Sequence, residues 1–461
     1  MGHAYTTIVC DILARTNRLQ NKEVYFLTGS DENTATIIKT ALEKNQTLED
    51  YFAEIAGRFK DLYEKLDVSY DQFIQTSDKK RHWPGVITLW NKLVEAGDIY
   101  KSKYNGLYCT RCEAFYTEKD LVDGKCPLHL MEPQKIEEEN YFFKLSKYTE
   151  EIKNKIENDE FKIIPISRKN EILSFLSEGL EDISFSRPSK VVPHGIPVPN
   201  DPDQKIYVWC DALTNYISAL GYGGEDELFK KFWPVNVHVI GKDILRFHAA
   251  IWPGMLLSAG LPLPKSILVH GLITSGGHKM SKTLGNVIDP FLLINEYGKD
   301  AVRYYLAREI SPFDDGDLTV EKFKESYNAN LANGLGNLVS RIMKMATAHL
   351  PSPVEITLET QPDTDVVAYL EAFEINRAMD RVWERIGHND ALIAIKEPFR
   401  GVKSEDIGVH NEAVLIIKKL VRELYAIATE LEPFMPETSA KIKELIKQNK
   451  MPAKPLFARK D

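Results

Sequence analysis

The sequence has few cysteines, no long apolar run and no excess of positive charge. Each of these absences bears on a class of protein to which the chain could belong. Five cysteines among 461 residues are too few and too scattered for a disulfide framework, so a reducing, cytoplasmic compartment is expected. No run of about 18 apolar residues is present to predict a membrane span. The net charge of -9 gives no global sign of nucleic-acid binding, although an acidic protein can carry a local basic face.

What is present is an ordinary globular composition in which strand-like and helical patterns alternate. Hydrophobic residues make up 43% and charged residues 27% of the chain, which is typical of a soluble protein with a large core. After a helical stretch at residues 4–20, strand-like and helical stretches follow in the order strand, helix, helix, strand. These stretches are 23–33, 34–45, 48–68 and 68–77. This order predicts a parallel α/β sheet.

Changes in composition and hydrophobic periodicity along the chain predict four segments. Residues 100–140 are interpreted as loop-rich and hold three of the five cysteines, and the α/β pattern resumes near residue 206. From about residue 325 the periodicity is almost purely helical. The predicted segments are the first half of an α/β domain (1–96), an insertion (97–205), the second half of that domain (206–324) and a helical domain (325–461).

The insertion carries residue types that bind metals. Cys109-x2-Cys112 is followed, after thirteen residues, by Cys126-x2-His129. Tetrahedral zinc takes four such ligands from two short knuckles. The alternative is that these are ordinary reduced thiols in a loop, but the segment has little apolar periodicity and a bound metal would supply the missing stability. Four protein ligands leave no open position, which predicts one structural zinc ion per chain.

A glycine-rich loop later in the chain carries two lysines. In "GGHKMSKT", Gly276 and Gly277 permit a mobile loop, and Lys279 and Lys282 stand three positions apart. Such lysines can close over a polyphosphate and stabilise the charge that develops during its transfer. As a bare pattern, two lysines near glycines are common and indicate a solvated turn more often than a phosphate site.

The amino-acid sequences of this loop and of several other blocks resemble those of one family. "KMSKT" resembles the KMSKS signature of class I aminoacyl-tRNA synthetases, and "MGH" resembles the end of their HIGH signature. Further blocks are similar to the methionyl-tRNA synthetases over essentially the whole chain. They are "GHAYTTIVCDILAR", "EENYFFKLSKY", "VWCDALTNYISALGY", "VIGKDILRFHAAIWPGML" and "HGLITSGGHKMSKTLGNVIDP". The resemblance implies an α/β fold with a Rossmann-like parallel-sheet catalytic domain, split by a zinc-knuckle insertion and followed by an all-α anticodon-binding bundle.

The resemblance also implies which residues handle ATP. Gly2 would let the nucleotide approach the backbone closely, and His3 would contact its phosphate or ribose at a helix N-terminus, where the dipole favours anions. Lys279 and Lys282 would stabilise charge around the α-phosphate. The remaining expected contacts are Gly241 and Asp243 at the ribose, and His270, Gly271 and Ile273 at the adenine.

A methionine site is implied in the same way. Asp31, in "TGSDEN", would pair with the ammonium group of the substrate in a charge-assisted hydrogen bond. Aromatic walls suit a thioether because sulfur packs favourably on rings. The residues expected to wall the side chain are Trp209, Ala212, Tyr216, Phe247 and His248. Without the resemblance, these aromatic residues would be interpreted as ordinary core packing.

The helical domain would recognise a CAU anticodon. Asn337 and Arg341 stand four apart and share one helix face, on which they would contact unstacked loop bases. Phe399 occupies the position where the family usually has a tryptophan that stacks on a base. Because phenylalanine offers a smaller face, weaker anticodon binding is expected. By spacing alone, the Asn and Arg pair fits a solvent-exposed face as well.

Some features depart from the family pattern. The chain begins inside the HIGH-like motif, without the strand that precedes it in the family, and impaired activity of this chain is therefore expected. Asn33 and Thr34 replace the usual His-Gly after Asp-Glu, so loop geometry is expected to differ because Thr lacks the backbone freedom of Gly. A tRNA-binding and dimerising module found in some relatives does not follow the helical domain, and a monomer is expected.

The implied activity is that of a methionine–tRNA ligase. L-methionine and Mg-ATP would give methionyl-adenylate, and the acyl group would pass to initiator and elongator tRNA(Met). Within the class, the valine, leucine and isoleucine enzymes have a larger insertion, and the cysteine enzyme holds zinc in its substrate pocket. The alternative from another class is a degenerate synthetase that only binds tRNA.

Overall fold

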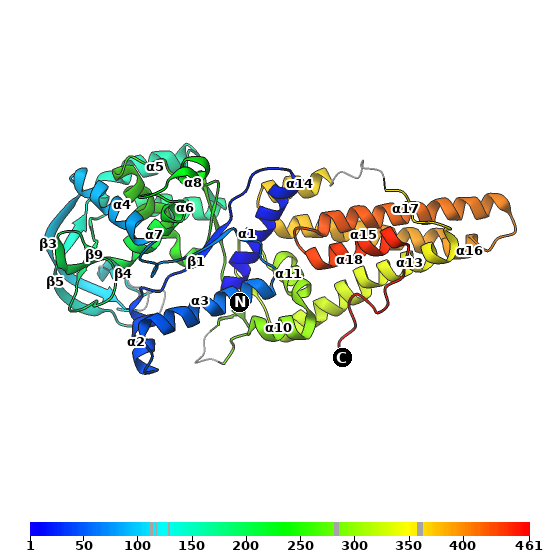
Figure 1. The fold of residues 1–461 in the computed structure, drawn as a ribbon, viewed down its shortest axis with the longest axis horizontal. Helices are drawn as coiled ribbons and strands as arrows, with labels where there is room; N and C mark the ends of the chain where they lie inside the picture. Colours follow the sequence, from blue (N-terminus) through cyan, green and yellow to red (C-terminus); the bar gives the residue numbers. More distant parts are fainter. Residues whose placement is uncertain (111–113, 117, 128–129, 281–284, 357–362) are drawn as a thin grey trace. The chain divides into compact units, whose positions relative to one another are not determined.

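Figure 1 shows the fold of the computed structural model, which describes residues 1–110, 114–116, 118–127, 130–280, 285–356 and 363–461. Contacts within the chain divide it into two compact units. Unit 1 comprises residues 1–24, 62–69 and 270–461, and unit 2 comprises residues 25–61 and 70–269. The four segments that the sequence predicts divide the chain by expected role instead. That division stays a prediction. None of the helices in the described ranges is both long and apolar enough to cross a membrane.

Unit 2 contains the parallel strands that the N-terminal strand–helix–strand order predicted. β1 (Leu27–Ser30) pairs in parallel with β2 (Gln72–Gln75), and Gly29 lies opposite Ile74. The two strands approach so closely here that a Cβ at Gly29 would lie 2.2 Å from the carbonyl oxygen of Ile74. Glycine is therefore required at this point of β1, directly before the polar loop that follows the strand.

A second group of strands in unit 2 is also parallel in part. β6 (Lys162–Ile164) runs parallel to β12 (Ser266–His270), and β11 (His238–Gly241) is the other neighbour of β12. The helices of these regions are α2 (Ala35–Glu43), α3 (Leu48–Lys65), α4 (Trp83–Glu95), α5 (Thr149–Glu157), α6 (Ile166–Ser177), α7 (Val208–Ser218), α8 (Glu227–Phe232) and α9 (Trp252–Ser258). A π-helical turn, Phe247–Ile251, directly precedes α9.

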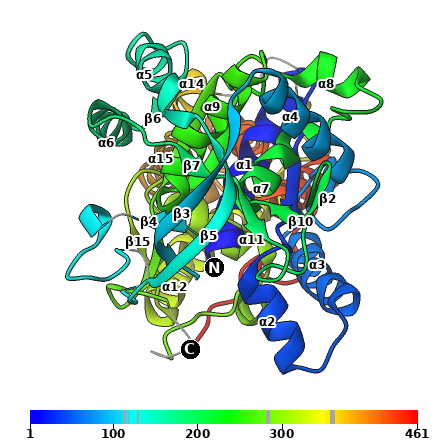
Figure 2. The ribbon, with the colours of Figure 1, turned by 90° about the vertical axis from the view of Figure 1, so that its left-hand side faces the viewer.

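The stretch 100–140, interpreted above as loop-rich, forms long antiparallel strands instead. β3 (Ile99–Cys109) pairs with β5 (Gln134–Phe143) along its length, and the two strands run side by side in Figure 2. Their middle residues are polar and mostly exposed. The buried positions of β5 also include polar side chains, such as Glu138 and Asn140, so the apolar alternation by which strands are recognised is lacking. The shorter strands are β4 (Ala114–Tyr116), β7 (Ile183–Ser184), β8 (Ser186–Pro188), β9 (Pro197–Val198) and β10 (Asp201–Ile206).

Helices α4 and α7 approach each other closely in the core of unit 2. A Cβ at Gly85 on α4 would lie 2.6 Å from the Cβ of Ser218 on α7. Trp90, also on α4, is fully buried beside them. This close crossing places polar side chains of the two helices within hydrogen-bond distance, which matters for the site described below.

Unit 1 is built around the first helix. The apolar spacing of α1 (Gly2–Leu19) predicts a buried face at Ile8, Ile12, Leu13 and Leu19; Leu19 at the end of the helix is exposed, whereas the first three are buried. Asp11 is buried among them and pairs with the fully buried Arg303, whose Nη2 lies 2.7 Å from the carboxylate. Burial opposes ionisation, yet Arg303 and Arg15 hold the pKa of Asp11 below its ordinary value. The charge is therefore retained inside the unit.

The rest of unit 1 consists of two helices, a small sheet and a helical C-terminal region. Beyond Asp317, the described residues contain helices and no strand. The elements are β13 (Ile273–Ser275), β14 (His278–Lys279), α10 (Pro290–Tyr297), α11 (Lys299–Arg308), β15 (Gly316–Asp317), α12 (Val320–Ser326), a π-helix (Tyr327–Gly336), α13 (Asn337–His349), α14 (Thr364–Glu371), α15 (Ile375–Lys396), α16 (Pro398–Gly401), α17 (Ile407–Leu431) and α18 (Pro436–Gln448). The proline-rich stretches 351–353 and 433–436 predict breaks between helices, and α13, α17 and α18 do end or begin beside them.

Candidate active site

In unit 1, the start of α1 meets a segment 264 positions further along the chain. Gly2 and His3 are exposed in the first turn of α1, which no side chain caps. The hydroxyl oxygen of Thr6 lies 2.8 Å from Nε2 of His270 and 3.2 Å from the carbonyl oxygen of Gly2. The structure thus brings the HIGH-like segment and the HGLI segment together. An uncapped helix N-terminus of this kind favours an anion.

His270 is held in one orientation. Its Nδ1 lies 2.7 Å from the carbonyl oxygen of Gly271, and because a carbonyl only accepts, Nδ1 carries the proton. The ring of Tyr5 stands edge-on at 5.1 Å. Gly271 packs against the backbone of Asp314, where a Cβ would lie 2.1 Å from the carbonyl oxygen. The glycine is thus required by chain packing, and Ile273 begins β13 two residues later.

Lys279 lies on a short hairpin. β13 and β14 pair antiparallel, and the turn between them is Gly276-Gly277, with φ of +64° and +75°. Two consecutive positive φ values are typical of the tight hairpin turns that glycine favours. Lys279 is exposed at the end of β14. Lys282 lies outside the described residues.

A carboxylate anchors this hairpin from outside. Asp317 on β15 accepts hydrogen bonds from the backbone N–H of Gly277 (2.8 Å) and the hydroxyl of Thr274 (3.1 Å), and it pairs with Lys322 at 2.7 Å. The Gly277 N–H is the main cause that lowers the pKa of Asp317 to about 2. Asp317 therefore stays ionised and holds the hairpin over the whole physiological range.

In unit 2, Asp31 follows directly after β1 and is half-buried. Its Oδ1 accepts hydrogen bonds from the Thr76 hydroxyl (3.0 Å) and the Asn33 backbone N–H (3.3 Å). Burial and the nearby carboxylate of Asp211 raise the pKa of Asp31 to about 7. No positive partner of this carboxyl occurs among the residues that the structure describes, which is the electrostatic condition for attracting an ammonium group.

Behind Asp31 lies a buried polar network that the sequence did not indicate. The Asn33 side-chain amide donates to Asp211 (2.7 Å), whose other oxygen lies 2.6 Å from Nε2 of His82. Nδ1 of His82 lies 2.7 Å from the Ser218 hydroxyl. Every member is buried. Single polar residues on separate elements have no regular spacing in the sequence from which a network could be predicted. The unusual Asn33 is the one residue whose identity pointed to this region.

Thr34 ends this loop directly before α2, and the expected difference of the loop from the family pattern stays a prediction. Thr34 adopts an ordinary extended conformation, with φ of -85° and ψ of 145°. Its hydroxyl accepts a hydrogen bond from the Ile37 N–H, so it caps α2. Nothing here requires the conformational freedom of glycine, and threonine is instead a favoured residue at a helix start.

The residues expected to surround a methionine side chain form an aromatic group in unit 2. The rings of Trp209 and Phe247 are stacked, with centroids 3.7 Å apart and planes within 10°. The Nε1 donor of Trp209 is buried and has no hydrogen-bond partner among the described residues. Ala212 lies on α7 one turn from Trp209. An orphaned donor next to stacked rings indicates an incomplete, ligand-accepting environment.

Tyr216 and His248 are hydrogen-bonded to each other. The Tyr216 hydroxyl lies 2.8 Å from Nε2 of His248, and Nδ1 of His248 lies 3.0 Å from the carbonyl oxygen of Ile244. Burial lowers the pKa of His248 to about 4, against the opposing effects of Ile244 and Asp243. The imidazole is thus neutral near pH 7. His238 and Trp252, which sequence reasoning did not select, pack against Tyr216.

Gly241 and Asp243 lie where strand β11 ends. Gly241 is the last residue of β11, and Asp243 follows in a single 3₁₀ turn. Both are partly exposed. The carboxyl ends of strands in α/β sheets are the usual position for nucleotide contacts, so their placement is compatible with the expected ribose role, which stays a prediction.

The three residues expected at the anticodon are separated along the helical region. Asn337 is exposed at the start of α13, and Arg341 one turn later pairs with Asp390 on α15 at 2.5 Å. Phe399 on α16 is 40% exposed, and the Arg400 guanidinium lies 5.8 Å from its ring centroid. A solvent-exposed aromatic ring beside an arginine can stack on a base.

Half of the expected zinc set can be described. Cys109 and Cys126 are buried in one small cluster with Ala114 and Tyr116. Cys112 and His129 lie outside the described residues. No group of three or more metal-binding side chains occurs within the described part of the chain, so the full ligand set stays a prediction.

Comparison with known proteins gives a consistent answer. The family model described as tRNA synthetases class I (M) matches residues 1–135 and 119–343. The methionine–tRNA ligase of Clostridium acetobutylicum is 44% identical, over 96% of this chain and 70% of that protein. That of Thermotoga maritima is 38% identical, over 98% of this chain and 74% of that protein. The crystal structure of Mycobacterium tuberculosis methionyl-tRNA synthetase bound by methionyl-adenylate matches with a TM-score of 0.91 at 36% identity, covering 96% of this chain and 90% of that one.

Proposed function

The chain belongs to the methionyl-tRNA synthetases, a family of class I tRNA synthetases, and from this premise we propose that it activates L-methionine with ATP and transfers the methionyl group to tRNA(Met). The observation that carries the proposal is the likeness, over nearly the whole chain, to a relative whose structure holds methionyl-adenylate. The alternative of a tRNA-binding protein without ligase activity is not favoured, because the likeness runs through the segments that would carry catalysis.

The first step forms the adenylate. A carboxylate oxygen of methionine attacks the α-phosphorus of Mg-ATP, the bond between that phosphorus and the oxygen bridging to the β-phosphate breaks, and pyrophosphate leaves. Asp31 pairs with the ammonium group of methionine. His3 at the start of α1, together with Lys279 and Lys282, stabilises the negative charge that develops on the phosphates. No covalent bond to the protein is needed.

The amino-acid side chain is selected by shape and polarity. The stacked rings of Trp209 and Phe247 and the Tyr216–His248 pair offer aromatic surface, on which a thioether packs well. The neutral state of His248 is important here because a charged imidazole would attract polar side chains of similar size. The buried Nε1 donor of Trp209 supplies one orienting hydrogen bond to the bound amino acid.

Nucleotide contacts are proposed for five further residues. Gly241 and Asp243 hold the ribose, and His270, Gly271 and Ile273 line the adenine. Support comes from the fixed orientation of His270, whose Nδ1–H is committed to the Gly271 carbonyl. In the second step, a ribose hydroxyl at the 3′ end of tRNA attacks the methionyl carbonyl carbon and AMP leaves.

Anticodon recognition is proposed for Asn337, Arg341 and Phe399. The exposed amide of Asn337 has hydrogen-bonding groups for a base edge, and Phe399 provides a stacking surface. Arg341 would exchange its ion pair with Asp390 for a base contact, or be oriented by it. The proposed partners are initiator and elongator tRNA bearing CAU, bound by a cytoplasmic monomer.

A structural zinc ion is proposed in the insertion. The two described thiols fit this role because Cys109 and Cys126 share one buried cluster. With Cys112 and His129 they would complete a four-ligand set that fixes the end of β3 to the following loop. The ion would stabilise this part of the chain and take no part in the reaction.

The test is methionine-dependent ATP–pyrophosphate exchange, followed by charging of tRNA with a CAU anticodon. At the reduced rate expected of this chain, it should exchange label with methionine and not with valine, leucine, isoleucine or cysteine. Lys279→Ala should reduce exchange about 100-fold, while Lys454→Ala, at another exposed lysine, should leave it unchanged. If wild-type protein binds the tRNA without any exchange, the tRNA-binding alternative replaces the proposal.

A further inference from the structure

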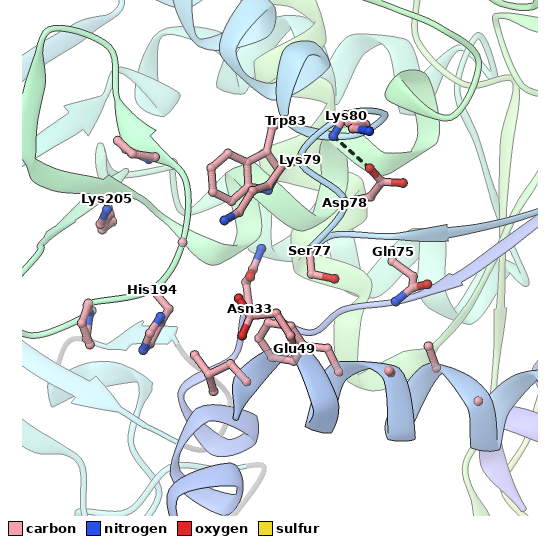
Figure 3. Close-up of a pocket in the computed structure, with 18 of the residues that line it drawn as sticks. Asn33, Glu49, Gln75, Ser77, Asp78, Lys79, Lys80, Trp83, His194 and Lys205 are labelled. Carbon is pink, nitrogen blue, oxygen red and sulfur yellow. Dashed lines mark hydrogen bonds between the residues drawn. The ribbon is translucent and has the colours of Figure 1, made fainter. Parts of the chain in front are cut away.

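Unit 2 contains a pocket of about 780 Å³ that none of the proposed contacts occupies. Figure 3 shows its walls: α3 with Glu49 on one side, the loop of Ser77 to Lys80 with Trp83 opposite, and His194 and Lys205 at one end. Asn33 also lines it, directly after Asp31 and Glu32. The pocket is therefore adjacent in the chain to the proposed ammonium contact.

Positive charge converges on this pocket in a protein whose net charge is -9. Four lysines line it, namely Lys60, Lys79, Lys80 and Lys205. None of them forms an ion pair within the described part of the chain, whereas many exposed lysines elsewhere do. The acidic lining residues are Glu49 and Asp78, and Asp78 accepts the backbone N–H groups of Lys80 and Arg81. Unneutralised lysines around a cavity favour a ligand with phosphate groups.

An aromatic face lies among these lysines. The Nζ of Lys79 lies 5.3 Å from the ring centroid of Trp83. The Trp83 indole N–H is bound to the carbonyl oxygen of Thr76 at 3.2 Å, which fixes the plane of the ring. A fixed, partly exposed ring flanked by cations is the combination that binds a base together with its phosphate.

The floor of the pocket carries small residues, and at one position no neighbouring atom requires the residue to be so small. The lining residues of α3 recur at helical spacing and include Ala53, Ala56 and Gly57. Gly57 lies within the helix, where glycine costs about 1 kcal/mol relative to alanine. A Cβ at Gly57 would meet no atom within 4 Å. The glycine thus lowers helix stability and leaves open space, which is reasonable if something else fills that space.

The wall is also tied to the proposed amino-acid site. The backbone N–H of Ser77 donates to Glu32 at 3.1 Å, and the Thr76 hydroxyl donates to Asp31 at 3.0 Å. The loop that carries Lys79, Lys80 and Trp83 is therefore built on the same residues that hold Asp31. A ligand in the pocket would lie beside the bound amino acid.

We propose that this pocket binds an unpaired nucleotide next to the 3′ end of the tRNA, with its base on Trp83 and its phosphate on the lysines. This rests on the proposed function, since the transfer step requires a single-stranded RNA end to reach the methionyl group. The nucleotides that precede the terminal one must then follow a path beside Asp31, and the pocket provides a cationic and aromatic surface there.

The test compares intact tRNA(Met) with the same tRNA trimmed of its unpaired 3′ nucleotides. Wild-type protein should bind intact tRNA about tenfold more tightly, as one stacked base provides. Gly57→Leu, which fills the floor and improves helix propensity, should abolish this difference. Lys79→Gln with Lys80→Gln should do the same and lower the slope of log K against log salt by about 0.7 for each phosphate that is no longer neutralised.

Three controls keep the result interpretable. Gly57→Ala adds one methyl group and should retain the difference with higher thermal stability. Lys103→Gln removes an exposed lysine of the same unit outside the pocket and should behave as wild type. ATP–pyrophosphate exchange, which needs no tRNA, should continue in Gly57→Leu. Absence of exchange in wild type would instead contradict the proposed function, whatever the tRNA comparison shows.

Two outcomes would overturn the pocket proposal. One is that the wild-type protein binds intact and trimmed tRNA equally well, or that the variants lose the same amount of affinity for both tRNAs. The other combines two results. Trimming has no effect, and AMP or ATP competes for the pocket with the trinucleotide CCA at the same concentrations. That second result would make the pocket a site for a free nucleotide.

Discussion

The ionisation of Asp31 controls whether the proposed amino-acid site can attract an ammonium group. Its pKa of about 7, raised by burial and by Asp211, means that the free protein holds this carboxyl protonated below neutral pH. Only the carboxylate attracts the ammonium group of methionine. We expect the affinity for methionine to be constant above about pH 8 and to fall about tenfold for each unit below about pH 6.5, as measured by titration calorimetry.

A matched pair of variants separates this effect from general acid sensitivity. Asp31→Asn should bind methionine weakly with no pH dependence in the same range. Asp203→Asn, at an exposed carboxyl of the same unit, should keep the wild-type profile. A wild-type affinity that stays flat down to about pH 5.5 would show that Asp31 is ionised throughout, or that it does not contact the ammonium group.

At this scale, sequence reasoning identifies residues that belong to recognisable blocks. Asp31, Tyr216 and His248 stand out because "TGSDEN", "WCDALTNY" and "RFH" resemble family blocks, although their roles stay predictions. His82 and Asp211 escape such reasoning because their relation exists only where α4 crosses α7 at Gly85. A hydrogen bond between positions 129 apart has no signature in a single sequence.

Among the elements, the β13–β14 hairpin depends on an anchor outside itself. Asp317 holds Gly277 and Thr274, and the hairpin in turn carries Lys279. Asp317→Asn should weaken this anchor and let Lys279 sample unproductive positions. We expect kcat for methionine-dependent ATP–pyrophosphate exchange to fall about tenfold, with KM for methionine unchanged, in steady-state assays.

Asp314→Asn provides the comparison, because this nearby carboxylate contacts Ser311 rather than the hairpin. It should retain wild-type kcat. An equal loss of kcat in both variants, or a change in KM for methionine alone, would mean that Asp317 supports the fold in general and not the position of Lys279.

The zinc proposal concerns the element formed by β3, β4 and the loop after them. We expect one zinc ion per chain by inductively coupled plasma mass spectrometry, with loss of metal and a lower melting temperature after chelation, because metal binding adds directly to folding stability. Cys109→Ser and Cys126→Ser should lose the metal, and Cys10→Ala should keep it. Full stability and activity in metal-free protein would contradict a structural ion.

Periodicity predicts the helices well and some of the strands poorly. α1, α3 and the long C-terminal helices follow apolar spacing that one buried face produces. The prediction of loop for β3 and β5 is wrong because both strands carry polar residues through their middle, on the buried positions of β5 as well as on the exposed ones. A buried face that is itself partly polar leaves no apolar alternation to detect.

At the scale of the molecule, unit 1 is held by a buried ion pair that joins distant parts of the chain. Arg303 contacts Asp11 and also donates to the carbonyl oxygens of Pro433 and Phe434. Arg303→Met removes the positive partner and leaves a buried carboxylate poorly compensated. We expect the free energy of unfolding to fall by about 3–5 kcal/mol, as measured by urea denaturation.

The double variant Asp11→Asn with Arg303→Met tests the electrostatic reason. Because it also removes the uncompensated charge, its loss should be smaller than the sum of the two single losses. Strict additivity would show that Arg303 acts through its carbonyl hydrogen bonds alone. The division into two units was not predictable from the sequence, since it depends on which distant segments share a core.

The burial of α1 has a consequence for the order in which the molecule is made. The Tyr5 hydroxyl bonds to Ser311, 306 positions later, and Asp11 pairs with Arg303. At roughly 5–20 residues per second, the first helix leaves the ribosome about 15–60 s before these partners exist. During that interval its apolar face has no native surface to cover it. Unit 1 therefore completes its folding only after translation of its C-terminal part, and until then α1 exposes apolar surface of the kind that makes nascent chains prone to aggregation.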